Sequence, residues 1–367
     1  MTQTGISRRK MKLTQLINPL AALTILILFN VIRGIIIGDL SFFSIILEHN
    51  NDGNAVLKGN LISIFDSASA LAIIAMGMTL VTAACGGQDI SVGAVGAIAG
   101  AVFVKLLTAF GDINVGTILV SFLGSVLVTV ICTMFNGTLV AVFRIQPMFA
   151  TLILFSCGRS IAYMITGSAT PMLNSPLTNA IGMTIPGVPI PTPIFIVAFV
   201  GLLLFIFFRL TNMRLYTQSV GINQGASRLN GINPMLVKLI SFIVLGVCVA
   251  AASLIQVCRL GQVAHKTLLV DIEMDAILAV AIGGNSLGVG RFRLAGSILG
   301  AYIIQMLTTT LNNLHVGPEE MKAYKAIVII IIVVAGSLVI KQAISKLWNR
   351  IFRREPVSTA GQGGEVR

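Results

Sequence analysis

The sequence has few charged residues, few cysteines and histidines, and no nucleotide-binding motif. Only 10% of its 367 residues are Asp, Glu, Lys or Arg, whereas about 25% is typical of a soluble globular domain. The five cysteines and three histidines have neither the spacing of metal ligands nor the pattern of a secreted disulfide scaffold, so we expect no metal site. No Gly-x-x-x-x-Gly-Lys-Ser/Thr sequence is present, which argues against ATP binding by this chain.

Hydrophobic residues are abundant instead. They make up 56% of the chain, and the mean hydropathy is +0.94. Several apolar runs reach the ~20 residues that a helix needs to cross ~30 Å of hydrocarbon. We therefore predict an all-α fold, a polytopic transmembrane helix bundle of about ten spans. The predicted spans are 17–38, 61–84, 91–109, 115–140, 147–166, 192–210, 236–257, 273–289, 295–314 and 324–340.

The distribution of charge predicts how the chain is oriented. With the N-terminus inside, most of the 25 basic residues fall in inner loops and tails, as the positive-inside rule requires. An even number of spans then places both termini in the cytoplasm. The predicted domains are a basic cytoplasmic N-terminus (1–16), a transmembrane domain (17–340) and a basic, partly disordered cytoplasmic tail (341–367). Because the net charge of +12 is spread over many short segments, we expect contacts with membrane lipid and none with nucleic acid.

Two glycine pairs lie in turns between apolar segments. We predict Gly86, Gly87 and Gly93 as structural residues of the first turn, and Gly283 and Gly284 as those of the second. Each pair is followed by two glycines four residues apart, a spacing that lets helix backbones approach closely. This similarity indicates either an internal repeat or a chance match among 36 glycines. The spaced glycines are Gly96 and Gly100 in one half, and Gly296 and Gly300 in the other.

The longest inner loop, 211–234, has a helical apolar pattern. Ala226, Leu229 and Ile232 recur every three residues, which predicts a short surface helix with one apolar stripe. Gln224, Ser227 and Arg228 would face water. The stripe suits the docking of a partner protein, although an ordinary basic loop is the simpler interpretation.

Polar residues within predicted spans are candidates for a solute path, because such groups are costly in lipid. Asp66 either faces the path or reaches interfacial water. Arg159 needs a water-filled cavity or a partner such as Asp66. Asn136, with Gly137, either lines the path or breaks a helix near the inner face. Neutral side chains that suit sugar hydroxyls complete the set of candidates, which is Asp66, Asn136, Gln146, Arg159 and Asn312.

Five separated motifs occur in a fixed order and resemble a known family. The chain is similar to the membrane permeases of bacterial ABC importers for monosaccharides, the ribose and galactose class, over roughly residues 60 to 340. Within that family it looks closest to the galactofuranose-type permeases, from 145–154, Gly158-Arg159 and Gly290-Arg291-Phe292. The five motifs are Gly77-Met78-Thr79-Leu80-Val81, Gly86-Gly87-x-Asp89-Ile90-Ser91-Val92-Gly93, Asn136-Gly137, Asn223…Ala226-x-Arg228-Leu229-x-Gly231-Ile232, and Ala281-Ile282-Gly283-Gly284.

The resemblance implies a function without covalent chemistry. It implies a permease of the bacterial plasma (inner) membrane that works by alternating access with an ABC ATPase subunit, which holds ATP and Mg. It also implies a second permease copy or a homologue, and an extracytoplasmic sugar-binding protein. The transported sugar, and whether the permease pairs with itself or a sister subunit, stay open. The resemblance assigns ATPase coupling to Asn223, Gln224, Gly225, Ala226, Arg228, Leu229, Gly231 and Ile232.

The sequence departs from the family pattern at a few positions. Cys85 and Gln88 stand where the family usually has a hydrophobic residue or glycine, and Gln224-Gly225-Ala226 where it has a charged residue and two alanines. A glycine inside a helix costs about 1 kcal/mol, so Gly225 puts the helicity of the docking loop in question. The alternative function is an ion-coupled secondary transporter of a small polar solute, in which Asp66 and Arg159 form the coupling site. A membrane-embedded enzyme would need a cluster of catalytic residues, which the sequence lacks.

Overall fold

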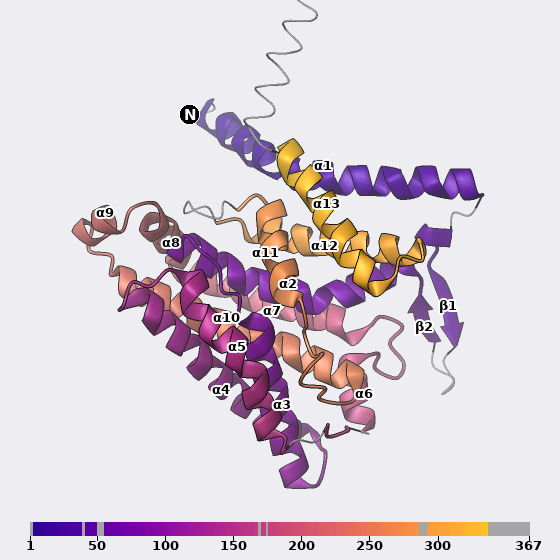
Figure 1. Cartoon of the computed structure of the whole chain (residues 1–367). Coiled ribbons are helices and arrows are strands. Elements are labelled where there is room, and N and C mark those ends of the chain that lie inside the picture. The colour runs from indigo at the N-terminus through magenta and orange to yellow at the C-terminus, as the bar shows by residue number, and fades with distance from the viewer. Residues whose placement is uncertain are drawn as a thin grey trace, which may run out of the picture.

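The computed structural model describes residues 3–38, 41–49, 55–167, 170–173, 175–285 and 292–336. These residues form a helical bundle with a two-stranded hairpin at one end (Figure 1). The helices are α1 (Gln3–Ile37), α2 (Asn60–Cys85), α3 (Val92–Phe110), α4 (Val115–Ala141), α5 (Pro147–Ile165), α6 (Pro176–Gly182), α7 (Thr192–Leu210), α8 (Met213–Ile222), α9 (Gln224–Leu229), α10 (Pro234–Leu260), α11 (Ile272–Ile282), α12 (Leu294–Asn313) and α13 (Pro318–Gly336), with a short 3-10 helix η1 (Ser41–Phe43) and strands β1 (Ile46–His49) and β2 (Ala55–Lys58).

Eight helices in the described residues are long and apolar enough to cross a membrane. They are the Pro19–Ile37 part of α1 together with α2, α3, α4, α5, α7, α10 and α12. The prediction of a polytopic helical bundle is therefore confirmed. α1 also extends back to Gln3, so the predicted N-terminal segment continues the first span as helix.

The other two predicted spans differ from simple crossings. Within 273–289 the structure has α11, whose 11 residues are about 16 Å long and too short to cross ~30 Å of hydrocarbon. Within 324–340 it has α13, which begins earlier, at Pro318, with Glu319 and Glu320 in its first turn. The last residues of that predicted span and the predicted tail 341–367 lie outside the described residues.

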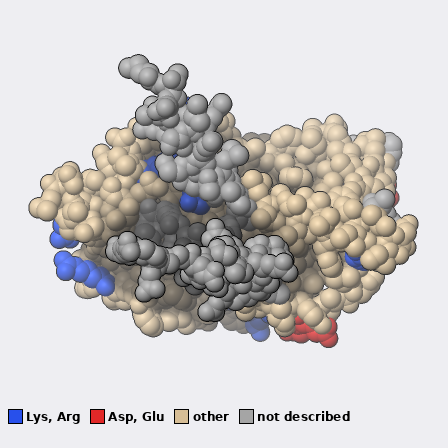
Figure 2. Space-filling model, turned by 90° about the horizontal axis from the view of Figure 1, so that it is seen from above, with Lys and Arg blue, Asp and Glu red and all other residues tan. Residues whose placement is uncertain are grey.

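The core of the bundle is α2. In its most apolar stretch 94% of the residues are buried, because α7, α8, α10, α11 and α12 surround it. Small residues allow this close packing: a Cβ on Gly77 would lie 3.0 Å from the Cα of Leu245 on α10. α7 is even more apolar, yet only 17% of the corresponding stretch is buried, which places it at the lipid-facing surface. Figure 2 shows one face of the molecule, on which most atoms belong to uncharged residues.

The two ends of the bundle carry different structures. α8 and α9 lie at one end, and the β1–β2 hairpin and α6 lie at the other (Figure 1). The hairpin pairs Ile46 with Lys58, and Leu57 N donates to Pro189 O at 2.9 Å. This hairpin departs from the all-α prediction. The sequence did not reveal it, because strands of four residues are too short to show a recognisable alternation of apolar and polar residues.

The helix break that was one of the two alternatives for Asn136 and Gly137 is absent. α2 is continuous from Asn60, and α4 runs through Asn136 and Gly137 to Ala141. Gly137 packs instead against Phe242 of α10, where a Cβ would lie 3.0 Å from the Phe242 Cβ. A glycine at this position serves helix packing, so the predicted break was wrong.

Candidate translocation and coupling sites

The first glycine turn joins α2 to α3 inside the protein. Gly86 ends α2 in the left-handed conformation (φ 65°), and its N–H donates to Thr82 O at 3.1 Å. Gly87 packs against the ring of Pro147 at the start of α5, where a Cβ would lie 2.9 Å from Cγ. At Gly93 a Cβ would overlap the carboxylate of Glu273 and the carbonyl of Leu269. All three positions therefore require glycine.

A buried carboxylate organises this turn. Asp89 is fully buried, and its Oδ1 accepts hydrogen bonds from Ser91 N at 2.7 Å and Ser91 Oγ at 2.6 Å. Asn136 donates through Nδ2 to Ser91 Oγ at 2.9 Å and, more weakly, to Asp89 Oδ2 at 3.4 Å. Burial raises the pKa of the Asp89 carboxyl above its ordinary value, and the hydrogen bonds from Ser91 and Asn136 oppose that shift. Asn136 therefore fixes the turn to α4.

The second glycine turn has a similar polar centre. Asn285 is buried, accepts from Arg293 N at 2.7 Å and donates to Ser297 Oγ at 2.8 Å. Thr79 of α2 donates to the same Ser297 Oγ at 2.6 Å. These bonds close the connection from α11 to α12 around residues 286–291, which lie outside the described residues. Asp89 and Asn285 were not among the site residues predicted from the sequence, although each lies within two residues of a glycine pair.

The glycines of the second turn also allow two helices to touch. A Cβ on Gly283 would lie 2.5 Å from the carbonyl carbon of Gly296, and one on Gly300 would overlap the Ala279 carbonyl. Gly284 has a φ of +79°, which favours glycine. The close approach predicted from glycine spacing is thus present between α11 and α12. Gly96 and Gly100 of α3 pack instead against α10 and residues 268–269. The internal repeat stays a prediction.

Residues 261–271 re-enter the bundle from the end where α10 stops. α3 and α10 lie side by side, with Ser253 Oγ donating to Gly96 O at 2.7 Å. Leu268 then packs against Gly100, and Leu269 against Gly96. Ser253 lies seven residues before the end of α10, so the segment descends about 10 Å beside it. α11 then starts within the bundle.

Arg159 of α5 holds this re-entrant segment. Its Nη1 donates to the carbonyls of His265 at 3.1 Å, Leu268 at 3.0 Å and Lys266 at 3.4 Å, and its Nη2 donates to Leu269 O at 3.4 Å. Non-helical backbone at membrane depth needs such partners, because lipid supplies none. Arg159 therefore has a clear positioning role.

The pair of Asp66 with Arg159, which the secondary-transporter alternative used, is absent. Asp66 accepts instead from Arg259 Nη2 at 2.7 Å, near the end of α10. This ion pair fastens the start of α2 to the end of α10, because the two helices are antiparallel. The expected partner of Arg159 was wrong, since sequence distance gives no information on which spans are neighbours.

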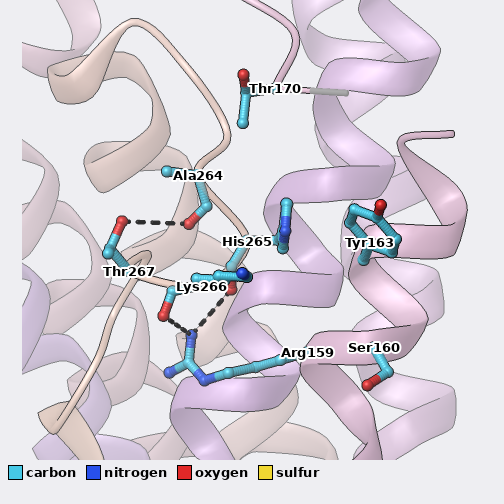
Figure 3. A pocket seen from close by; sticks show the side chains of 8 residues that line it. All are labelled: Arg159, Ser160, Tyr163, Thr170, Ala264, His265, Lys266 and Thr267. Carbon is cyan, nitrogen blue, oxygen red and sulfur yellow. Dashed lines mark hydrogen bonds between the residues drawn. The ribbon is translucent and has the colours of Figure 1, made fainter. Parts of the chain in front are cut away.

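Arg159 also lines a cavity of about 640 Å³ between α5 and the re-entrant segment (Figure 3). Ser160 and Tyr163 of α5 line it with Thr170 and residues 264–267. The rings of Tyr163 and His265 lie 4.7 Å apart between centroids, with their planes at 58°. Of the five path candidates, Arg159 is the one that borders this cavity.

The remaining path candidates lie apart from this cavity. Asp66 lines a separate cavity of about 260 Å³ near the hairpin. Asn136 is buried in the polar network of the first turn. Gln146 and Asn312 are exposed, at the start of α5 and near the end of α12. The structure therefore does not gather the five candidates into one site.

The predicted coupling loop forms two helices, α8 and α9. Asn223 caps α9, because its Oδ1 accepts a hydrogen bond from Ala226 N at 3.0 Å. Gly231, two residues after α9, has a φ of +77°, which favours glycine. α9 forms despite Gly225, because the cap satisfies one of the free N–H groups at the helix start. Gln224, Arg228 and Leu229 are exposed.

Two side chains of this loop point differently from the prediction. Ser227, expected to face water, is buried and donates to Asn223 O at 2.8 Å. Ile232, expected on the docking stripe, packs instead against the cluster of Ala84, Met213, Val220 and Val237. Leu229 is 91% exposed, so the accessible apolar surface centres on Leu229 while Ile232 anchors the loop.

Comparison with known proteins identifies the family. Residues 60–336 match the family described as "Branched-chain amino acid transport system / permease component". The chain belongs to this family. Its relatives include the galactofuranose transporter permease protein YtfT of Escherichia coli, which is 36% identical over 81% of this chain and 83% of the relative. No solved structure matches the chain significantly.

Other relatives have similar coverage. The fructose import permease protein FruF of Bifidobacterium longum is 36% identical over 77% of this chain and 79% of its own length. The ribose import permease protein RbsC of Escherichia coli is 32% identical over 76% of this chain and 85% of its own length. The resemblance to importer permeases predicted from the motifs is therefore confirmed, and the chain is a membrane-spanning permease component.

Proposed function

We propose that the chain is the permease subunit of an ATP-driven importer for a monosaccharide in the bacterial inner membrane. The named sugar permeases among its relatives support a sugar over a branched-chain amino acid, since they align with most of the chain at 32–36% identity. It forms the translocation path and performs no covalent chemistry. ATP and Mg²⁺ bind to a separate ATPase subunit, and this chain holds no cofactor.

The connectivity supports ten crossings with both termini in the cytoplasm. α10 ends beside the start of α2 through Arg259 and Asp66. α12 ends beside α1, where Arg33 Nη2 donates to Asn313 O at 2.6 Å. Because α10 and α12 both end on this side, residues 261–293 must return the chain to the other. The re-entrant segment and α11 together make the eighth crossing, within the permease domain 17–340, between an N-terminal segment 1–16 and a tail 341–367.

The partners occupy opposite ends of the bundle. The ATPase subunit docks on the α8–α9 loop, and the extracytoplasmic sugar-binding protein approaches the end that carries the β1–β2 hairpin. A second permease copy or a homologue completes the path. The loop lies between α7 and α10, and α10 packs along α2 and continues into the re-entrant segment. A movement of the loop therefore reaches the outer half through α10, which is how ATP binding selects between two states.

The observation that carries this proposal is the exposure of Leu229 on a capped helix at the inner end. We expect Leu229→Asp to reduce co-purification of the ATPase subunit at least about tenfold, because an apolar anchor in an interface contributes on the order of 2 kcal/mol. ATP-dependent sugar uptake should fall in parallel.

Ile185→Asp is the matched control for co-purification, since Ile185 is an exposed apolar residue in the loop 183–191 at the opposite end. It should leave ATPase co-purification unchanged. Normal assembly and uptake in the Leu229→Asp variant would contradict docking at this loop.

A further inference from the structure

The cavity beside Arg159 contains a buried polar atom without a partner. His265 is only 9% exposed, and its Nδ1 makes no hydrogen bond within the described residues. Buried polar atoms in proteins almost always have a partner, so an exception needs a physical reason. In Figure 3 the His265 ring lies beside the Tyr163 ring on the cavity wall. Nδ1 itself has almost no exposed surface, so a ligand in the cavity would supply the missing hydrogen bond after the ring turns.

The charges around the cavity argue against a cation or a zwitterion. The Arg159 guanidinium already donates to four backbone carbonyls, and Lys266 is the second basic residue of the lining. No Asp or Glu is among the residues that line the cavity, so nothing there would pair with an ammonium group. A free amino acid, which carries both charges, is therefore a poor fit.

The other lining groups suit a neutral polyol. Tyr163 offers a ring that is 41% exposed, against which the apolar face of a sugar can pack. Ser160, Thr170 and Thr267 line the same space, and a hydroxyl can both donate and accept hydrogen bonds. The volume of about 640 Å³ lies within the ~300–1,000 Å³ of small-molecule sites.

We propose that this cavity is a binding site for a neutral monosaccharide, with Tyr163 packing on the sugar ring and the His265 ring turning so that its Nδ1 hydrogen-bonds to a sugar hydroxyl. The proposal rests on the function proposed above and gives the path a specific site in its outer half. Arg159 acts there as a positioning residue, because it holds His265 and Lys266 through their carbonyls.

A cysteine-protection experiment tests the site. The Ser160→Cys variant, assembled with its ATPase subunit in proteoliposomes, is treated with a water-soluble maleimide, and modification at position 160 is measured by peptide mapping. D-ribose, D-fructose and D-galactose are tested as probes at rising concentration, with L-leucine as the comparison. We expect at least one sugar to slow modification, by about threefold at twice its dissociation constant, and leucine to have no effect.

Matched controls separate binding from general changes. Ser156→Cys lies one turn earlier on the exposed side of α5 and outside the lining residues, so the sugar should not slow its modification. Adding Tyr163→Ala or His265→Phe to Ser160→Cys should raise the sugar concentration needed for protection several-fold. Tyr324→Ala, which removes a similarly exposed ring from α13, should not.

The outcomes distinguish this inference from the proposed function. Protection by leucine, no protection by any of the three sugars, or no modification at position 160 would overturn the cavity site. If the unsubstituted importer with its binding protein still accumulates sugar in an ATP-dependent way, the proposed function survives that result. If it accumulates none of the sugars, the function itself fails.

Discussion

Asp89 shows how a single side chain determines the path of the chain between two helices. Its carboxylate accepts from Ser91 twice and from Asn136 once, and the side chain is fully buried. Removing the carboxylate would leave buried donors unsatisfied, which costs more than the loss of one exposed hydrogen bond.

We therefore expect Asp89→Ala to lower stability by about 1–3 kcal/mol, measured as a lower melting temperature of the detergent-solubilised protein. Asp112→Ala is the control, because Asp112 lies exposed in the loop before α4 and should leave the melting temperature unchanged. Equal melting temperatures for the two variants would contradict the role of the buried network.

At the scale of single residues, the sequence shows which polar side chains make buried contacts better than it shows which residues they contact. Asn136 and Arg159 stand out as polar groups within apolar spans, and both make buried or partly buried contacts. Their partners are 45 and more than 100 positions away, and no local pattern specifies such a distance. Asp89 belongs to a family motif, but the sequence does not show that its carboxylate is buried, because an acidic residue in a turn is normally solvated.

Among the elements, α9 depends on one capping residue. Its six residues are too few to form a stable helix alone, and Asn223 supplies the side-chain acceptor at its start. The Ile232 anchor then holds the loop against α8 and α10.

We expect Asn223→Ala to destabilise α9 by about 1 kcal/mol and to raise amide hydrogen exchange in 224–229 about fivefold. Asn223→Asp keeps the acceptor and should exchange like the unsubstituted chain. Unchanged exchange in the alanine variant would show that packing alone maintains this helix.

Long apolar elements were predictable, and short ones were not. The eight long helices match predicted spans closely, because an uninterrupted run of ~20 apolar residues matches the thickness of the bilayer and is rarely needed elsewhere. For the predicted span 273–289 the same apolar signal did not reveal that the helix is short, since a helix buried inside a bundle is as apolar as one that crosses lipid. The hairpin and the re-entrant segment have no distinctive pattern, and their conformations depend on contacts with α5, α3 and the loop 183–191.

At the scale of the whole molecule, charge and connectivity lead to the same topology. Basic residues concentrate in the segments that we propose to lie inside, and α1, α2, α10 and α12 meet at the end that we propose as the outer one.

We expect a reporter that is active only in the cytoplasm to give a signal when fused to either terminus, with a periplasmic reporter inactive at both. Signals on opposite sides would contradict the ten-crossing topology. A fusion within 183–191 is the control and should report the outer side.

The hydrogen bonds of Arg159 have a mechanical consequence for the permease. They tether α5 to the backbone of 265–269, and this backbone continues directly from α10, whose other end carries α9. Axial sliding of α10 against α5 is thereby limited to the slack in the few residues between Leu260 and His265. We therefore expect a pull on the α9 end of α10 to displace the wall of the cavity beside Arg159.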